Sequence, residues 1–338
     1  MSSGALKQAA RGSLSRAGAV AIAMTLALGA AACGPAGPET SGGTGHARLD
    51  TEPGRPLPSP LRGVTTDSVV DREQLVRAVS DHSRAPTVRI VFEQDTPVRA
   101  YAAAIGRLRP HAYLMGELLD SDALSDFSVS QVRERTEKFV AAYGDRIDVW
   151  EIGNELNGSW TGDSPGEINA KVLAAYDVVK EHGGRTALTL NHWSGPDCYE
   201  KAWEPTSAYA RLMPERLKRG ADFVLLSIYE TACSPAQHPT ADQIGATLVR
   251  LGKTFPRAKL GIGEVGAQRK QDGLAKDPGL AEKKRLAQRY YGMQSALEKR
   301  VGPRFVGGYF WWYYAEDAVP RDRAASLWPT LDRLLRSL

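Results

Sequence analysis

The sequence of 338 residues lacks the patterns that mark several classes of protein. It contains no GxxxxGK[ST] stretch, and its one GxGxxG stretch, at 261–266, lies late in the chain instead of after an early strand, which argues against a P-loop and a dinucleotide-binding fold. Its six histidines show no ligand spacing such as HExxH, so we expect neither a metal nor an organic cofactor. Basic residues do not cluster with aromatic ones, so nucleic acid is not an expected partner. Beyond the first 32 residues, no apolar run is long enough to span a bilayer.

The N-terminus has the order of a signal peptide, in which three basic residues precede an uncharged apolar run that ends at residue 32. Cys33 then follows three alanines, in an arrangement that resembles a bacterial lipoprotein, whose cysteine becomes lipidated. We therefore expect residues 1–32 to be removed and Cys33 to anchor the exported protein to the outer side of the cell membrane. Cleavage at a plain Ala-x-Ala site is the alternative, and it would give a secreted soluble protein.

Residues 33–60 have a composition different from the rest of the chain, because Gly, Pro, Ser and Thr dominate and almost nothing apolar is available to bury. This composition is typical of a flexible linker, so we predict a tether here and a single catalytic domain over residues 61–338. The whole chain has 43 basic and 39 acidic residues, and the three basic residues of the signal peptide account for most of that excess. The mature protein should therefore be almost neutral.

Short β-rich runs alternate with helical patterns from residue 61 onward, and there are eight of each. The expected strands are 62–66, 88–93, 112–117, 147–154, 187–192, 223–229, 260–264 and 306–312. The expected helices lie near 71–82, 97–107, 129–143, 166–182, 206–218, 241–254, 279–300 and 326–337. Eight strand-helix units in about 250 residues are typical of a TIM barrel. We therefore predict an α/β fold of the (β/α)8 barrel type.

The remaining two cysteines, Cys198 and Cys233, follow the fifth and sixth expected strands. An exported protein meets an oxidising compartment, where an even pair of cysteines is most simply interpreted as a disulfide. Because consecutive strands are neighbours in a barrel, we expect this bond to join two adjacent loops on the active-site face.

Two glutamates stand where the chemistry of a barrel enzyme is located, at the C-terminal ends of strands. Glu155 closes the fourth expected strand and Glu264 closes the seventh, each after a glycine that leaves space for a substrate. Cleavage of a glycosidic bond needs one carboxylic acid to protonate the leaving oxygen and one carboxylate to attack or to activate water. The pair therefore predicts glycoside hydrolysis.

Three stretches resemble the retaining glycosidases of clan A: WEIGNE at 150–155, GEVG at 263–266 and GYFWW at 308–312. The resemblance implies that Glu155 is the acid/base, that Glu264 is the nucleophile and that Asn154 binds the 2-hydroxyl of the sugar. Arg89 resembles the arginine that supports the nucleophile in that clan. A structural ion pair of Arg89, with Glu151 for example, is the alternative.

The same resemblance suggests further substrate-binding residues. Tyr229, at the end of the sixth strand, matches a tyrosine that hydrogen-bonds the nucleophile. Trp312 matches the tryptophan that forms the floor of the sugar subsite, and Trp311 is the alternative if the register is shifted by one residue. His192 and Trp193, after the fifth strand, either line the substrate site or are simply packed.

The sequence thus predicts a retaining hydrolase that acts on a β-linked oligo- or polysaccharide. The competing hypothesis is a surface barrel that binds carbohydrate and is catalytically silent. The presence of two glutamates in these positions favours the enzyme, since a binding protein needs no paired acid and nucleophile.

Overall fold

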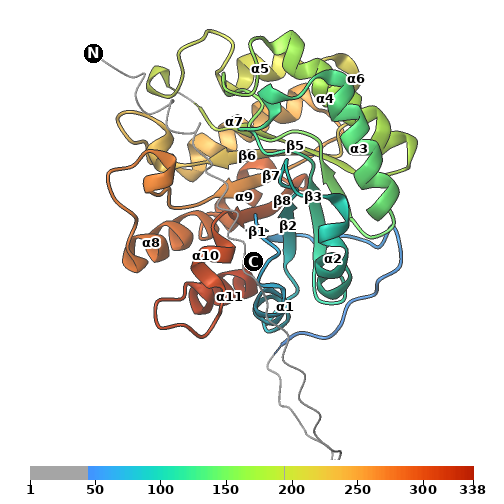
Figure 1. Ribbon diagram of the computed structural model, residues 1–338. Coiled ribbons are helices and arrows are strands. Elements are labelled where there is room, and N and C mark those ends of the chain that lie inside the picture. The colour runs from blue at the N-terminus through green and yellow to red at the C-terminus, as the bar shows by residue number, and fades with distance from the viewer. Residues whose placement is uncertain (1–44, 194) are drawn as a thin grey trace, which may run out of the picture.

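Eight parallel strands close into a barrel in sequence order, and helices surround it (Figure 1). The computed structural model describes residues 45–193 and 195–338. Every strand pairs in parallel with the next, and β8 pairs with β1 to complete the closure. The (β/α)8 barrel predicted from the strand-helix alternation is therefore confirmed.

The elements of the described part have the following bounds. The strands are β1 (Leu61–Thr66), β2 (Thr87–Val91), β3 (Tyr113–Glu117), β4 (Val149–Glu151), β5 (Thr186–Asn191), β6 (Phe223–Ile228), β7 (Lys259–Val265) and β8 (Phe305–Trp311). The helices are α1 (Arg72–Ser80), α2 (Ala102–Leu108), α3 (Val129–Tyr143), α4 (Pro165–Glu181), α5 (Thr206–Leu212), α6 (Glu215–Gly220), α7 (Ala241–Thr254), α8 (Leu280–Tyr291), α9 (Gln294–Val301), α10 (Tyr314–Ala318) and α11 (Trp328–Ser337).

Two predicted helices are each divided in the structure. The segment predicted as 206–218 ends at Leu212 and resumes at Glu215, because Pro214 cannot continue a helix from the preceding turn. The segment predicted as 279–300 divides at Gly292, where α8 ends and α9 follows. The short helix α10, which comes directly after the last strand, was not predicted.

The apolar core has two parts, inside and outside the strand cylinder. The inner cluster consists of Leu61, Met115, Val149, Ala187, Phe223, Leu225, Val306 and Phe310. A larger cluster lies between the strands and the helices. Side chains alternate between the two faces of a strand, so the residue two positions after an inner core residue also points inward. This rule places Glu117, Glu151, Thr189 and Ser227 one layer above the inner apolar cluster.

The predicted flexible tether has to be corrected for its described part, residues 45–60, which packs against the barrel. Arg55 is 5% exposed and donates two hydrogen bonds to the carboxylate of Asp148, at 2.9 and 2.7 Å. The backbone of Leu49 donates to Pro110 at 2.8 Å. Composition could not show this contact, because hydrogen bonds of Arg55, Arg109 and His46 hold most of the segment. Leu57 adds one apolar contact with the inner cluster.

The signal peptide, the rest of the tether and Cys33 lie outside the described residues, and their assignments stay predictions. Across residues 45–193 and 195–338, none of the helices has the length and apolar character needed to cross a bilayer.

Candidate active site

A polar layer sits on the inner apolar cluster, and the buried guanidinium of Arg89 lies at its centre. Arg89 on β2 contacts Glu151 at 3.0 Å and Glu117 at 3.4 Å, and it also donates to Oε1 of Glu264. Thr189 on β5 donates to Glu151 from the next strand. Both interpretations of Arg89 therefore hold geometrically, since it pairs with Glu151 and with Glu264 at the same time.

Glu264 enters this layer through an irregularity in β7. The register against β6 runs from Leu226 and Ile262 directly to Ser227 and Glu264, so that Gly263 is an extra residue in β7. A Cβ at Gly263 would lie 2.9 Å from the side chains of Leu225 and Thr189, and no side chain fits there. Such a bulge re-aims the residues beside it, and here it brings Glu264 level with Ser227.

Glu155 lies beyond the end of β4 in an unusual backbone conformation. Its φ is 48°, in the left-handed region that residues other than glycine adopt at a cost of about 1–3 kcal/mol. The turn is held by its carbonyl oxygen, which accepts from the amide of Gly158 at 2.8 Å and from the side chain of Asn191 at 3.3 Å. Strained residues of this kind concentrate at functional sites, and this turn directs Glu155 toward Glu264.

One hydroxyl joins the two glutamates. Oγ of Ser227 lies 2.5 Å from Oε1 of Glu155 and 3.2 Å from Oε2 of Glu264. The distance between Oε1 of Glu155 and Oε2 of Glu264 therefore cannot exceed the sum of these two distances. The structure thus brings together the pair that was expected from opposite sides of the barrel.

The environment favours a proton on Glu155. Burial raises the pKa of Glu155 well above its usual range, and the negative charge of Glu264 raises it further. Hydrogen bonds from Ser227 and Ser121 oppose this shift. Glu264, by contrast, receives hydrogen bonds from Arg89 and from Tyr229. The two glutamates therefore differ in their surroundings, since hydroxyl groups contact Glu155 while a guanidinium and a phenol hold Glu264.

Tyr229 occupies the position expected of it, and its hydroxyl donates to Oε2 of Glu264 at 2.9 Å. Burial and the charge of Glu264 raise the pKa of Tyr229 well above its usual range, so the phenol keeps its proton and stays a donor.

Asn154 precedes Glu155 and is 2% exposed. Its Nδ2 donates to Oδ1 of Asp120 at 3.2 Å, while its Oδ1 has no partner among the described residues. The pKa of Asp120 is raised to about 8 by burial and by the charges of Asp122 and Glu264. A buried acceptor left unpaired in this way is available to a hydroxyl group of a ligand.

The two tryptophans at the end of β8 are distinguished by their surroundings. Trp311 is fully buried in the outer core, and its indole N–H donates to Asp317 at 2.9 Å. The ring of Trp312 is partly exposed and lies 4.9 Å from the guanidinium carbon of Arg89. Trp312, and not Trp311, is therefore the residue beside the polar layer.

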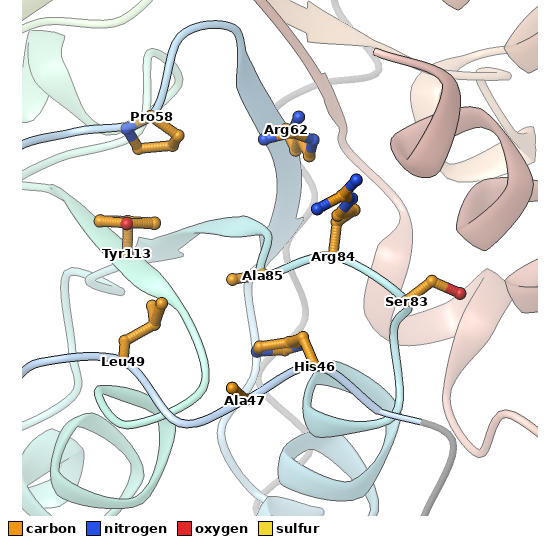
Figure 2. A pocket seen from close by; sticks show the side chains of 9 residues that line it. All are labelled: His46, Ala47, Leu49, Pro58, Arg62, Ser83, Arg84, Ala85 and Tyr113. Atoms are coloured by element: carbon orange, nitrogen blue, oxygen red, sulfur yellow. The ribbon is translucent and has the colours of Figure 1, made fainter.

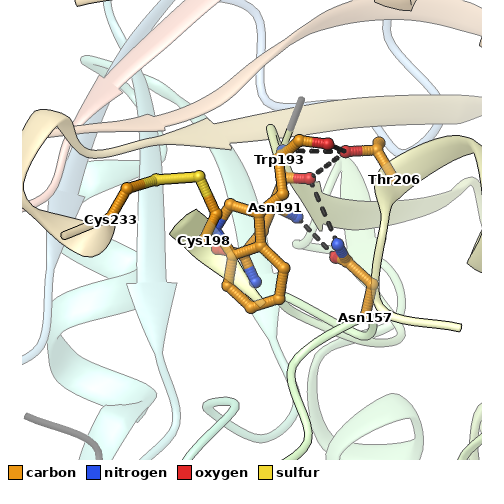
Figure 3. The surroundings of a disulfide bond; sticks show 6 residues. All are labelled: Asn157, Asn191, Trp193, Cys198, Thr206 and Cys233. Carbon is orange, nitrogen blue, oxygen red and sulfur yellow. Dashed lines mark hydrogen bonds between the residues drawn. A yellow bond between two sulfur atoms is a disulfide. The ribbon is translucent and has the colours of Figure 1, made fainter. Parts of the chain in front are cut away.

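The structure contains the disulfide expected between Cys198 and Cys233 (Figure 3). It joins the loops after β5 and β6, with a Cα–Cα distance of 4.2 Å. Trp193 is 6% exposed and packs against the two cysteines, with its ring edge-on to Trp160 at 5.7 Å. Of the two interpretations of Trp193, the structure favours packing.

His192 is 7% exposed, and neither ring nitrogen has a partner among the described residues. Burial, together with the charge of Arg250, lowers its pKa to about 4, so the ring is neutral near pH 7. His192 is therefore a buried neutral ring with free donor and acceptor atoms.

Three acidic residues, Asp67, Glu93 and Glu316, follow the C-terminal ends of β1, β2 and β8. Burial and the charge of Asp67 raise the pKa of Glu93 to about 7. The same causes raise the pKa of Glu316 to about 7. These groups change charge near neutral pH. Among the described residues, no group of three or more His, Cys, Asp or Glu side chains is arranged to hold a metal ion.

Three residues of the site were not predicted from the sequence. Ser227 and Ser121 contact Glu155, and Asp120 contacts Asn154. Ser227 precedes Tyr229 by two positions, and strand alternation places both on one face, so the signal was present in the sequence. Asp120 and Ser121 lie in the loop after β3, where no periodicity operates and no motif was recognised.

Comparisons with solved structures find proteins that share the barrel fold. No family model and no curated protein matches the sequence significantly. A glucosidase from Croceicoccus marinus is similar in structure, with a TM-score of 0.55 and 14% identity over 87% of this chain and 69% of that one. A beta-glucosidase named 1317 has a TM-score of 0.54 and 14% identity, over 79% of this chain and 87% of its own. A broad specificity endoglucanase from an uncultured bacterium has a TM-score of 0.53 and 13% identity, over 80% of this chain and 86% of its own. At these identities the likeness establishes the shared fold.

Proposed function

We propose that the protein is a glycoside hydrolase that cleaves a β-linked oligo- or polysaccharide with retention of anomeric configuration. Glu155 is the acid/base and Glu264 is the nucleophile. The substrate class is drawn from the structural neighbours, which are named as glucosidases and an endoglucanase.

The observation that carries the proposal is the hydroxyl of Ser227 between the two carboxyl groups, at 2.5 and 3.2 Å. Because both carboxyl groups contact the same hydroxyl, the two contacting oxygens lie closer together than the ~6.5–9.5 Å between the carboxyl groups of inverting enzymes. Inverting enzymes need that larger separation to hold a water molecule. The two contact distances are compatible with the ~5–5.5 Å at which a carboxylate attacks the sugar directly.

The electrostatics supports the same division of roles. In the first step the proton of Glu155 passes to the leaving oxygen, the C1–O bond breaks and an oxygen of Glu264 bonds to C1. In the second step Glu155, now ionised, takes a proton from water. The water oxygen then bonds to C1 and releases Glu264 as a carboxylate. Arg89 and Tyr229 both donate to Glu264 and hold its oxygens in place between the two steps.

The two glutamates should fail in different ways when they are replaced. Glu264→Ala removes the attacking atom and should abolish turnover of good and poor leaving groups alike. Glu155→Ala should keep its first step on aryl β-glycosides, whose leaving groups need no proton. The glycosyl-enzyme should then accumulate, and added azide should release it as the β-glycosyl azide. With Glu264→Ala, azide should give the α product.

The test uses NMR of the products formed from a panel of aryl β-glycosides and β-glucans, with Glu134→Ala as a matched control on the exposed face of α3. Inverted products from the unaltered enzyme, or azide products exchanged between the two variants, would show that the roles are wrong. No turnover on any glycan, together with carbohydrate binding, would favour the silent binding barrel.

We also propose that the protein is exported and held at the membrane by lipid on Cys33. The support is the order of charged, apolar and small residues in the first 33 positions and the disulfide, which is typical of oxidising compartments.

A further inference from the structure

A cavity of about 410 Å³ lies at the end of the barrel where the strands begin (Figure 2), whereas the glutamates stand at the end where the strands finish. Its walls come from the starts of β1 and β3, from the turn before β2 and from residues 46–58. The lining residues are His46, Ala47, Leu49, Pro58, Arg62, Ser83, Arg84, Ala85 and Tyr113. Nothing in the proposed hydrolysis uses this cavity.

Two guanidinium groups lie together at one wall. Figure 2 shows the side chains of Arg62 and Arg84 close to each other, with Pro58 and Tyr113 across from them. Burial lowers the pKa of Arg62, and the positive charge of Arg84 lowers it further. This like-charge contact is unfavourable in the absence of a neutralising anion.

The carboxylates near this wall are already engaged. Asp81 forms an ion pair with Arg321 at 2.9 Å. Asp332 accepts hydrogen bonds from the backbone and the hydroxyl of Ser83, at 2.7 and 2.8 Å. In the described part of the chain, no hydrogen bond or ion pair engages the guanidinium of Arg84.

Arg62 is held in place by the C-terminal helix. It donates to backbone oxygens of Leu335 at 3.0 Å and of Leu338, the last printed residue, at 3.1 Å. These bonds fix the guanidinium of Arg62 beside that of Arg84. Arg84 therefore supplies free donors, and Arg62 supplies a fixed positive charge beside them.

His46 is held against the wall of the cavity by two backbone oxygens. Its Nδ1 lies 2.9 Å from the carbonyl oxygen of His82, and its Nε2 lies 2.7 Å from that of His111. The ring therefore fixes the start of the segment that covers this end of the barrel.

We propose that this basal cavity binds a phosphate group, with Arg84 as the principal donor and Arg62 as the fixed charge. A guanidinium matches the geometry of phosphate oxygens and makes charge-assisted hydrogen bonds to them. The hydroxyl of Tyr113, for which no bond to another described residue is found, is the third donor. The apolar walls formed by Ala47, Leu49 and Pro58 accommodate the carbon atoms of an ester.

The phosphate has two possible sources, a phospholipid headgroup and a soluble phosphate ester. Residues 46–49 form part of the cavity wall, and they follow the predicted anchor closely in the sequence. The eleven residues between Cys33 and Gly45 span at most about 40 Å when extended. A lipidated Cys33 therefore keeps this end of the barrel within reach of the headgroup layer, with the glutamates at the far end.

The test is calorimetry on the exported protein at low ionic strength, where charge interactions are least screened. Three probes are titrated: inorganic phosphate, glycerol 3-phosphate and glycerophosphoglycerol, the last being a phospholipid headgroup without acyl chains. Binding of at least one probe is expected. A preference for the phosphodiester identifies a headgroup as the source, and a preference for phosphate or the monoester identifies a soluble ligand.

Variants locate the binding in this cavity. Arg84→Gln should weaken binding about 10- to 100-fold, as expected for the loss of a hydrogen bond to a charged group. Tyr113→Phe keeps the ring over Arg55 and should weaken binding about 3- to 10-fold. Arg107→Gln, on the exposed side of α2, is the matched control and should bind as the unaltered protein does.

The proposal is overturned if none of the three probes binds at millimolar concentration. It is also overturned if Arg84→Gln binds as tightly as the unaltered protein, or if Arg107→Gln loses as much affinity as Arg84→Gln. Arg84 is exposed and has no structural partner, and thermal unfolding of each variant verifies that the fold is intact. None of these outcomes depends on glycosidase activity.

Discussion

Replacing Ser227 with alanine tests the electrostatic link between the two glutamates. The hydroxyl has a single proton and lies within hydrogen-bond distance of both carboxyl groups. When Glu155 is ionised, the hydroxyl donates to it and stabilises the charge. The bond from Ser227 accordingly lowers the pKa of Glu155, against burial and the charge of Glu264, which raise it. Ser227→Ala should therefore raise the pKa of Glu155 still further.

The size of the effect follows from the strength of the lost bond. A hydrogen bond to a charged group contributes about 1.5–3 kcal/mol, and one pKa unit corresponds to about 1.4 kcal/mol. Because the proton of Ser227 is shared between two acceptors, the lower value applies, and we expect a shift of about one unit. Glu155 must be protonated for the first step, so its pKa sets the basic limb of the kcat/KM profile. That limb should move to higher pH by about one unit.

Two measurements check this result. The pH profile of kcat/KM with an aryl β-glycoside gives the limb directly, and NMR titration of ¹³C-labelled glutamate follows the carboxyl of Glu155 without any substrate. Ser121→Ala removes a longer bond to Glu155, of 3.3 Å, and should give a smaller shift in the same direction. Ser130→Ala, on the exposed side of α3, should give none. A basic limb that stays in place, or moves to lower pH, in Ser227→Ala would refute the reasoning.

Other predictions concern the lipid anchor at Cys33, the disulfide and the carboxyl group of Glu316. Cys33→Ser should release the protein from membranes with unchanged specific activity, and unchanged membrane partition would contradict lipidation. Reduction of the bond between Cys198 and Cys233, which closes a separation of 35 residues, should lower the free energy of unfolding by about 2–4 kcal/mol in denaturant titrations, and an unchanged midpoint would contradict this. The pKa of Glu316 is raised from 4.5 to about 7, so the folded state binds this proton more tightly than the unfolded state does. The free energy of unfolding should therefore fall as pH rises through this range, by up to about 3 kcal/mol. Glu316→Gln should flatten that decline in unfolding curves, and an equally steep decline would show that other groups cause it.

Much of the barrel could be predicted from the sequence, because buried parallel strands and amphipathic helices have different periods. The predicted helices 129–143 and 241–254 coincide with α3 and α7, and each begins at a Ser or Thr cap that accepts from the backbone three residues later. The fourth strand was predicted to extend to residue 154, yet β4 ends at Glu151. The chain leaves the sheet there to form the turn at Glu155, and hydrophobic pattern alone does not record a change of φ.

The site was predictable where residues follow the strand period and unpredictable where they do not. Tyr229 could be located because it follows the strand period, and Glu264 because it stands in the GEVG stretch at the end of a strand. Alternation from Ile262 in the outer core would point Glu264 outward, and the bulge at Gly263 turns it to the inner face. Asp120 and Ser121 come from a loop, so their contacts depend on the path of the backbone after β3. The pairing of Arg89 with three carboxylates also required coordinates, since it joins residues on four different strands.

The ion pair between Arg55 and Asp148 determines where the protein can be shortened. A protein shortened to begin at residue 61, the start of the first strand, would lose Arg55. The buried carboxylate of Asp148 would then keep only the longer ion pair with Arg109, at 3.6 Å, in place of the 2.7 Å contact with Arg55. Removing one partner of a buried ion pair costs up to about 3–5 kcal/mol, and Arg109 and the amide of Leu114 would offset part of that loss. Fusion partners and affinity tags should therefore be joined before residue 45. Proteases that remove residues 45–60 should produce a fragment that unfolds at a lower temperature, even though every strand and helix of the barrel is still present.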